Sequence, residues 1–144
     1  MKRVAAICYR RIGSRPEFLL VGTKDYPAWT FPKGKVDPGD KGDARAAAAR
    51  EAFEEAGVRG IVADRPLTSY RYPAHDGEAR LVEAYLMEVH SQGQPRAKER
   101  GYRHPQWFSS DEARERLAEN REPEYAEEHA RVLEAALAEI APPG

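Results

Sequence analysis

Apolar segments alternate with turn-forming sequences along most of the chain. Residues 3–11 and 17–23 are rich in apolar residues and are separated by the sequence GSRP, so they predict a β-hairpin. Residues 60–73 and 79–90 predict further strands, and the sequence QWFS at 106–109 predicts another short strand. The chain is therefore expected to contain a sheet of several strands.

Helical patterns occupy other parts of the chain. Residues 43–56 follow a glycine-rich loop, with Asp43 as a candidate N-cap and Gly57 as a candidate C-terminal stop. Residues 109–120 and 123–140 predict two more helices, of which the second is amphipathic. The order of strands, helix, strands and helices predicts an α+β, or mixed α/β, domain with helices packed on a sheet.

The size and charge of the chain limit what the protein can be. Its 144 residues suffice for one domain, 1–144, and its net charge of -1 argues against binding DNA through overall charge. No apolar run approaches the roughly 18 residues needed to span a bilayer, and the N-terminal apolar run is too short for a signal peptide. The single cysteine, Cys8, is expected to be buried and has no disulfide partner in the chain. We expect a cytoplasmic protein without membrane contact, either a monomer or a homodimer.

The helix predicted over residues 43–56 carries an unfavourable group of charges. At about 100° per residue, one face is apolar and is expected to pack on the sheet; it consists of Ala46, Ala49, Phe53 and Ala56. Glu51, Glu54 and Glu55 are expected on the opposite side. Like charges three or four residues apart repel each other, and the helix dipole disfavours negative charge near the C-terminus.

Two interpretations of these glutamates are open. They could form a solvated face with Arg50 and Arg59 as partners, or they could bind hard divalent cations such as Mg²⁺, which prefer carboxylate oxygens. The preceding loop favours the second interpretation, because its glycines allow close approach of the backbone to a ligand and its lysines offer anion contacts. These loop residues are Gly34, Gly39, Gly42, Lys33 and Lys35.

From this loop to the end of the helix, the sequence resembles the Nudix hydrolase signature, G-x5-E-x7-R-E-U-x-E-E-x-G-U, in which U is a bulky apolar residue. Gly34 matches the first glycine, and the block REAFEEAGV at 50–58 matches the end of the signature, with Ala52 at a bulky position. Asp40 replaces the first glutamate. Nine residues rather than seven separate it from Arg50, which leaves the role of Asp40 open.

The resemblance implies a Nudix-type α/β/α sandwich with a mixed sheet and a loop–helix–loop motif, and an enzyme that hydrolyses a phosphoric anhydride. It implies that Glu51, Glu54 and Glu55, with the carbonyl of Gly34, bind Mg²⁺, with Mn²⁺ as an alternative. Arg50 is expected to orient these glutamates by ion pairing. The base that takes the proton from water is expected to be Glu51 or Glu55, with Glu99 as a weaker candidate.

Several other residues are candidates for contact with a small, phosphate-rich substrate. The basic candidates are Lys24, Lys33, Lys35, Arg71 and Arg103, of which Lys33 is favoured because it lies next to the motif. The aromatic residues Tyr26, Trp29, Tyr70 and Tyr72 could stack on a base, although aromatic residues in strands more often belong to the core.

The sequences FPKGKVDPGD, EEAGVRG and WFSSDEA look most like the diphosphoinositol polyphosphate phosphohydrolase-like branch. Members of this branch act on diphosphoinositol polyphosphates and dinucleoside polyphosphates. Two alternatives remain open at this point. One is another Nudix activity, on nucleoside triphosphates or RNA 5'-ends, and the other is a nucleotide-binding module without catalytic activity.

Overall fold

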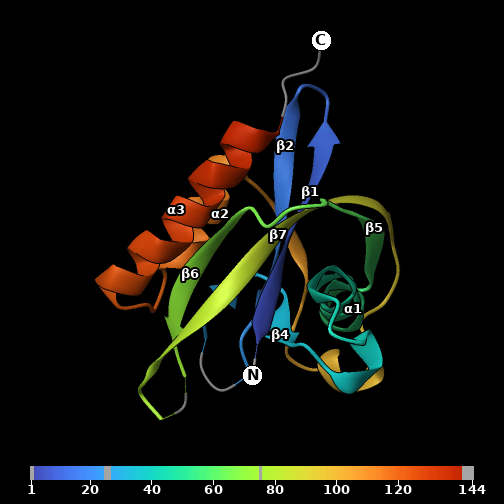
Figure 1. Ribbon diagram of the computed structural model, residues 1–144. Coiled ribbons are helices and arrows are strands. Elements are labelled where there is room, and N and C mark those ends of the chain that lie inside the picture. The colour runs from blue at the N-terminus through green and yellow to red at the C-terminus, as the bar shows by residue number, and fades with distance from the viewer. Residues whose placement is uncertain (1, 25–26, 75, 141–144) are drawn as a thin grey trace.

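A computed structural model describes residues 2–24, 27–74 and 76–140 and shows the predicted α+β fold (Figure 1). Its strands are β1 (Arg3–Ile12), β2 (Arg15–Gly22), β3 (Trp29–Thr30), β4 (Lys33–Lys35), β5 (Val58–Val62), β6 (Thr68–Pro73), β7 (Ala79–Gln92) and β8 (Gln106–Ser109). Its helices are α1 (Ala44–Ala56), α2 (Ser110–Ala118) and α3 (Pro123–Glu139), with two short 3-10 helices, η1 (Pro38–Asp40) and η2 (Ala97–Glu99). Within the described part, no helix is long and apolar enough to cross a membrane.

Strand β1 organises the sheet. It pairs antiparallel with β2, as the predicted hairpin requires, and it also pairs antiparallel with the short strand β4. On its other side it runs parallel to β7, with Ile7 opposite Leu86. Strands β3 and β8 pair with β2, while β5 and β6 pair with β7, so the sheet is mixed.

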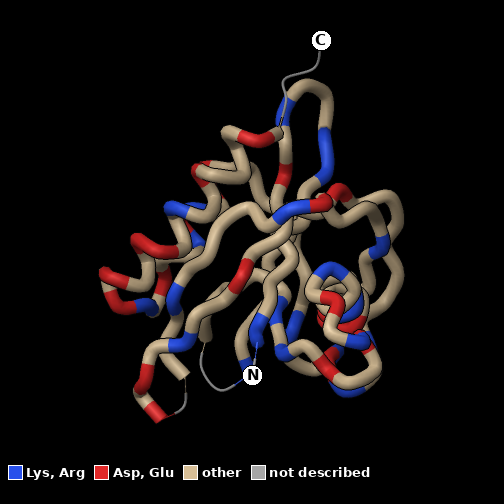
Figure 2. The backbone as a smooth tube through the Cα atoms, in the orientation of Figure 1, with Lys and Arg blue, Asp and Glu red and all other residues tan. Residues whose placement is uncertain are grey.

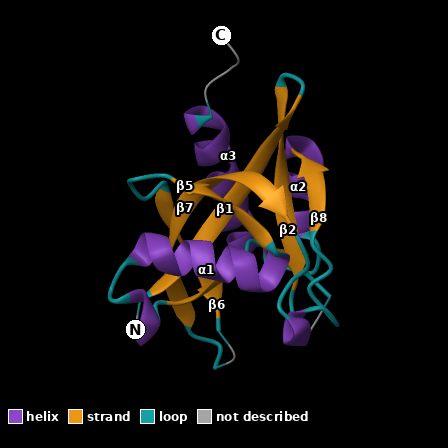
Figure 3. Cartoon of the chain, turned by 90° about the vertical axis from the view of Figure 1, so that its right-hand side faces the viewer, coloured by secondary structure: helices purple, strands orange, loops and turns teal. Residues whose placement is uncertain are grey.

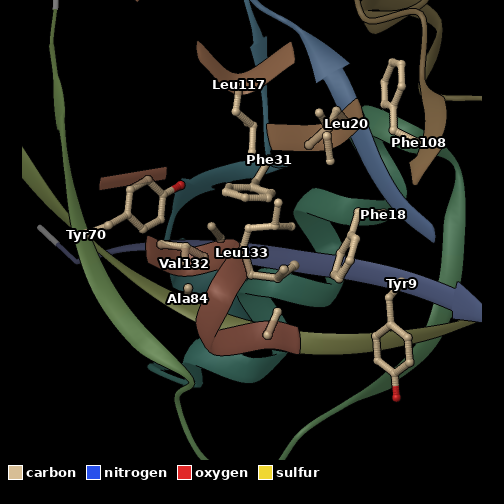
Figure 4. Close-up of a cluster of buried hydrophobic side chains, with 14 of the residues drawn as sticks. Tyr9, Phe18, Leu20, Phe31, Tyr70, Ala84, Phe108, Leu117, Val132 and Leu133 are labelled. Carbon is tan, nitrogen blue, oxygen red and sulfur yellow. The ribbon is translucent and has the colours of Figure 1, made fainter. Parts of the chain in front are cut away.

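The helices cover both faces of this sheet. Helix α1 lies on one face, and α2 and α3 lie together on the other (Figures 1 and 3). Successive residues of β1 point to opposite faces, so Val4 and Cys8 pack under α1 whereas Ile7 packs under α3. The larger cluster, on the α3 side, includes Phe31 and Leu133 (Figure 4). Cys8 is fully buried, as predicted.

Local signals in the sequence define both ends of α1. The side chain of Asp43 accepts hydrogen bonds from the backbone N–H groups of Arg45 and Ala46, which would otherwise have no partner. At the other end, Gly57 has φ 72°, a left-handed conformation that glycine adopts without steric cost. Both predicted ends of this helix are therefore confirmed.

The face of α1 that packs on the sheet differs from the predicted one. The buried residues are Ala47, Ala48, Ala52, Glu55 and Ala56. Ala46 is exposed, Ala49 is only partly buried, and Phe53 is 40% exposed, with the guanidinium of Arg59 at 4.1 Å from its ring centre. Glu55 therefore lies on the packed side rather than opposite it. Alanines occur on both sides of this helix, so the apolar pattern does not determine which side packs.

Two segments contain more structure than the sequence predicted. The expected loop before α1 contains β4 and η1, and β4 places Gly34 opposite Val4 of the central strand. The single strand predicted over residues 60–73 is instead two strands, β5 and β6, which pair with different parts of β7. The pairing of β4 matters most for function, because it fixes the loop beside α1.

Gly57 offers a test of how tightly α1 is fitted into the fold. A Cβ at this position would lie 2.4 Å from the carbonyl oxygen of Gly93, whereas a Cβ on Gly42, which has φ 77°, would meet nothing within 4 Å. We expect Gly57→Ala to lower the free energy of unfolding by about 3 kcal/mol, because backbone strain and a backbone clash add. Gly42→Ala, with strain alone, should cost about 1 kcal/mol. Urea unfolding measures both values, and equal losses would show that the close approach is unimportant.

Candidate active site

Strand β4 and helix α1 bring the glycine loop against the glutamates. A Cβ on Gly34 would lie 2.3 Å from the carboxyl group of Glu51, so any side chain at this position would displace that carboxyl group. The backbone N–H of the neighbouring Lys33 points to Glu55 and donates a hydrogen bond to its Oε1 at 3.3 Å. The backbone of the loop is therefore in direct contact with two of the three predicted ligands.

Glu55 and Glu51 form a buried carboxyl pair. Glu55 is 4% exposed, and burial raises its pKa to about 8, although the charge of Arg103 opposes the shift. Burial also raises the pKa of Glu51, although hydrogen bonds with Glu55 and Arg50 oppose it. The two carboxyl groups are hydrogen-bonded to each other. Without a bound cation, the pair therefore favours a state in which the carboxyl groups of Glu51 and Glu55 share one proton.

This pair fits a hard divalent cation. Its donors are carboxylate oxygens next to glycine backbone, and a cation would offset the same negative charge that the proton offsets here. Glu54 is placed differently, because its carboxylate contacts Arg50 at 3.0 Å and Arg96 at 3.2 Å. Over the described ranges, no three acidic, histidine or cysteine side chains stand together as a preformed ligand set. Glu51, Glu55 and the Gly34 backbone are the groups best placed to hold an ion.

Arg50 connects the loop to the helix. Its guanidinium contacts Glu51 at 2.7 Å, donates to the carbonyl oxygen of Lys35 at 2.9 Å, and binds both carboxylate oxygens of Asp40 at 3.1 Å. These hydrogen bonds hold the pKa of Asp40 below its usual value. The two additional residues of the loop form a turn, with Lys41 at φ 54° and Gly42 at φ 77°, which returns the chain to α1. The structure thus pairs the carboxylate of Asp40 with the guanidinium of Arg50. In spite of its shorter side chain and the longer loop, Asp40 contacts the arginine that also contacts Glu51.

A cleft of about 500 Å³ opens beside Gly34. Four of the five basic residues named as candidates line it, and they are Lys24, Lys33, Lys35 and Arg103. Arg3, which was not predicted, also contributes to its wall. Burial lowers the pKa of Lys33, whose ammonium lies 4.9 Å from the centre of the Tyr72 ring. Basic and acidic residues thus lie close together around α1 and the neighbouring loops (Figure 2).

Arg71 does not join this group. Its backbone N–H and its guanidinium both contact Glu128 of α3, on the other side of the sheet from α1. Its neighbour Tyr72 lines the cleft, whereas Arg71 does not. The guanidinium of Arg71 thus lies against α3 and outside this cleft, and its contact with a substrate stays a prediction.

The other aromatic candidates divide according to their burial. Tyr70 is fully buried, and Trp29 packs edge-on against Phe108 with ring centres 5.2 Å apart, so both belong to the core. Tyr26 lies outside the described residues. Among the candidates in the described part, Tyr72 is the one that lines the cleft.

Glu99, the weaker candidate for the base, lies in a polar stretch of the sequence but is buried in the structure. It is 5% exposed and accepts hydrogen bonds from Arg96, Tyr102 and Arg103. Burial alone would raise its pKa, but the hydrogen bonds from Tyr102 and Arg103 outweigh burial and lower it. Only the spacing of Arg96 and Arg103, three residues before Glu99 and four after it, could have indicated this cluster.

Comparison with known proteins shows the family of the chain. Residues 1–133 match the family model described as the NUDIX domain, which covers most of the chain. The chain therefore belongs to the Nudix family, as the resemblance implied.

Particular relatives differ in how much of the chain they match. A segment of 60 residues is 45% identical to rat "Diphosphoinositol polyphosphate phosphohydrolase 2", covering 41% of this chain and 32% of the relative. Another comparison, over 65 residues, is 38% identical to a "Putative 8-oxo-dGTP diphosphatase" from Bacillus subtilis (strain 168), covering 45% of this chain and 42% of the relative. These matches span less than half the length of the curated relatives. The C. elegans Ap4A hydrolase structure is similar over 97% of this chain and 98% of its own, with a TM-score of 0.73 and 26% identity.

The carboxyl pair predicts how the stability of the metal-free protein depends on pH. The pKa of Glu55 is about 8 in the folded state, above its ordinary value of 4.5, so the folded state binds the proton more tightly. The free energy of unfolding should therefore fall as pH rises from about 4.5 to 8. Glu55→Gln removes this component, so between pH 6 and pH 8 the variant should gain about 2 kcal/mol relative to the unsubstituted protein. Urea unfolding in the presence of a chelator measures the difference, and parallel pH profiles would contradict the buried carboxyl pair.

Proposed function

We propose that this protein is a Mg²⁺-dependent Nudix hydrolase that cleaves a pyrophosphate bond in a dinucleoside polyphosphate or a diphosphoinositol polyphosphate-like substrate. The observation that carries the proposal is the position of the Glu51–Glu55 pair beside a cleft lined by basic residues. The cleft supplies contacts for a chain of phosphates, and the carboxyl pair supplies ligands for the cation that such a chain requires. Neither group alone would indicate this chemistry.

Each group in the site has a part in the proposed reaction. Glu51, Glu55 and the Gly34 backbone would hold the ion, and Arg50 keeps Glu51 and Glu54 in place by ion pairing. A bound divalent ion polarises a phosphoryl group and lowers the pKa of bound water. Glu51 and Glu55 are the proposed proton acceptors, since burial raises the pKa of both carboxyl groups and makes each carboxylate a stronger base.

The basic residues of the cleft would bind and orient the phosphates. Lys33 lines the cleft with its ammonium 4.9 Å from the centre of the Tyr72 ring, where a phosphate oxygen would meet it partly shielded from water. Lys24, Lys35 and Arg103 line the same cleft and would contact further phosphates. Tyr72 offers an aromatic ring on which a nucleobase of the substrate would stack.

The relatives support the substrate class without fixing the substrate. Their names cover diphosphoinositol polyphosphates, an asymmetrically cleaved bis(5'-nucleosyl) tetraphosphate and 8-oxo-dGTP. The similarity to the C. elegans Ap4A hydrolase over nearly the whole of both chains favours dinucleoside polyphosphates. Hydrolysis of nucleoside triphosphates remains the second candidate because of the Bacillus relative.

A substrate panel with product analysis tests this function. Purified protein with Mg²⁺ or Mn²⁺ is incubated with diadenosine polyphosphates, diphosphoinositol polyphosphates, nucleoside triphosphates and triphosphate-ended RNA. We expect turnover of the first or second class, and Glu55→Gln should lower kcat by at least about a hundredfold. Release of a mononucleotide and pyrophosphate from triphosphates alone would favour the second candidate. Binding without turnover of any compound would indicate a non-catalytic module.

The cleft makes a separate prediction about Lys33. Lys33→Gln should raise KM about tenfold or more, because it removes a charged contact to phosphate from a site shielded from water. Arg71→Gln serves as the matched control, since its side chain faces Glu128, and it should change KM less than twofold. Steady-state kinetics on the best substrate of the panel measure both. Equal effects of the two substitutions would contradict the assignment of the cleft.

A further inference from the structure

Glu99 is the centre of a buried hydrogen-bond cluster in the loop before β8. Its Oε2 accepts hydrogen bonds from the hydroxyl of Tyr102 at 2.5 Å and from Nε of Arg103 at 2.9 Å, and its Oε1 accepts one from Arg96 at 3.2 Å. Both carboxylate oxygens are therefore already engaged. A carboxylate held in this way is poorly placed to accept a proton from water.

The two arginines held by Glu99 also contact the acids of α1. Arg96 lies 3.2 Å from Glu54, and Arg103 lies 3.3 Å from Glu55. Each arginine thus bridges Glu99 to one glutamate of α1, and Arg103 bridges it to Glu55 of the proposed metal site. Arg103 also donates to the carbonyl oxygen of Gly22 at 2.9 Å, which fixes its guanidinium at the wall of the cleft.

The backbone of the same loop is attached at three points. The N–H of Gly93 donates to the carbonyl oxygen of Gly57, and the N–H of Arg96 donates to that of Glu54, both at 2.8 Å. At the other end of the loop, the carbonyl oxygen of Arg103 accepts a hydrogen bond from the N–H of Gly22 at 2.6 Å. Between these points, the side chain of Glu99 is the group that connects the two arginines.

We propose that Glu99 is a positioning residue, which holds Arg96 and Arg103 against Glu54 and Glu55 and fixes the loop over residues 93–105 beside the cleft. This inference rests on the proposed function for its effect on cation binding and extends it to a residue outside the glycine–helix motif. Glu99 acts through the two arginines and takes no part in the reaction itself.

The charges of the cluster determine the direction of the effect. Arg103 is a positive charge next to Glu55, which would hold a cation, and Arg96 is one next to the neighbouring Glu54, so both oppose cation binding. Glu99 provides a second negative partner for both arginines. Without it, the arginines pair with Glu54 and Glu55 alone, and a divalent cation must compete with them.

Two substitutions at Glu99 separate a positioning role from that of a base. Glu99→Gln keeps an acceptor oxygen for Tyr102 and Arg103, whereas Glu99→Ala removes both. We expect Glu99→Ala to speed amide hydrogen exchange over residues 93–105 and to weaken Mn²⁺ binding, measured by electron paramagnetic resonance, about tenfold. Glu99→Gln should recover most of both losses and most of kcat.

The matched control is Glu119, which also accepts a hydrogen bond from an arginine three residues before it but is exposed and does not line the cleft. Glu119→Ala should change neither loop exchange nor Mn²⁺ affinity. Unchanged exchange and affinity in Glu99→Ala would overturn the proposal. It would also be overturned by a Glu99→Gln protein with a native-like loop and turnover as low as that of Glu99→Ala, which is the behaviour of a base. If the unsubstituted protein binds no Mn²⁺, the metal part of the proposed function fails, and hydrogen exchange alone decides the role of Glu99.

Discussion

The central physical constraint in this protein is the burial of carboxyl groups next to one another on α1. A buried carboxylate is costly unless it is protonated or paired with a positive charge, and two side by side cannot both be ionised without further compensation. The three glutamates satisfy this constraint in two different ways. Glu51 and Glu55 share a hydrogen bond and have raised pKa values, while Glu54 is neutralised by Arg50 and Arg96. The arginines and the glycine loop are arranged around these acids.

Close packing of α1 follows from the same constraint. The helix presents alanines to the sheet, with Ala48, Ala52 and Ala56 spaced four residues apart, and these small side chains let its axis approach β1 and β4 closely. Without that approach the carboxyl group of Glu51 could not lie against Gly34, nor could Glu55 reach the N–H of Lys33. A side chain larger than alanine at position 48, 52 or 56 would take up space between α1 and the sheet. It would also move Glu51 and Glu55 away from the glycine loop. Packing and electrostatics are therefore coupled in this helix.

The sequence predicted the positions of the helices and strands better than it predicted which of their faces are packed and which distant segments are in contact. The hairpin, the ends of α1 and the strand 106–109 follow from local patterns, and the structure contains them. The packed face of α1 could not be predicted, because alanine occurs on both sides of the helix. The side to which Arg71 points depends on the register of β6 with β7, a pairing between segments that no local pattern fixes. The burial of Glu99 depends on arginines that fold back over α1, so its polar surroundings in the sequence were misleading.

The distribution of charge limits the kind of ligand that suits the site. The chain as a whole has a net charge of -1, yet the cleft gathers five basic residues and faces a carboxyl pair that is partly protonated without a cation. A ligand with a single negative charge would offset the charge of only one of these basic residues. A cation alone would satisfy the carboxyl pair but would be repelled by Lys33 and Arg103. A polyphosphate with its bound divalent cation satisfies both groups at once, because its negative charges meet the basic residues while its cation meets the acids. This matching supports the proposal of a substrate with several adjacent phosphates over that of a singly charged ester.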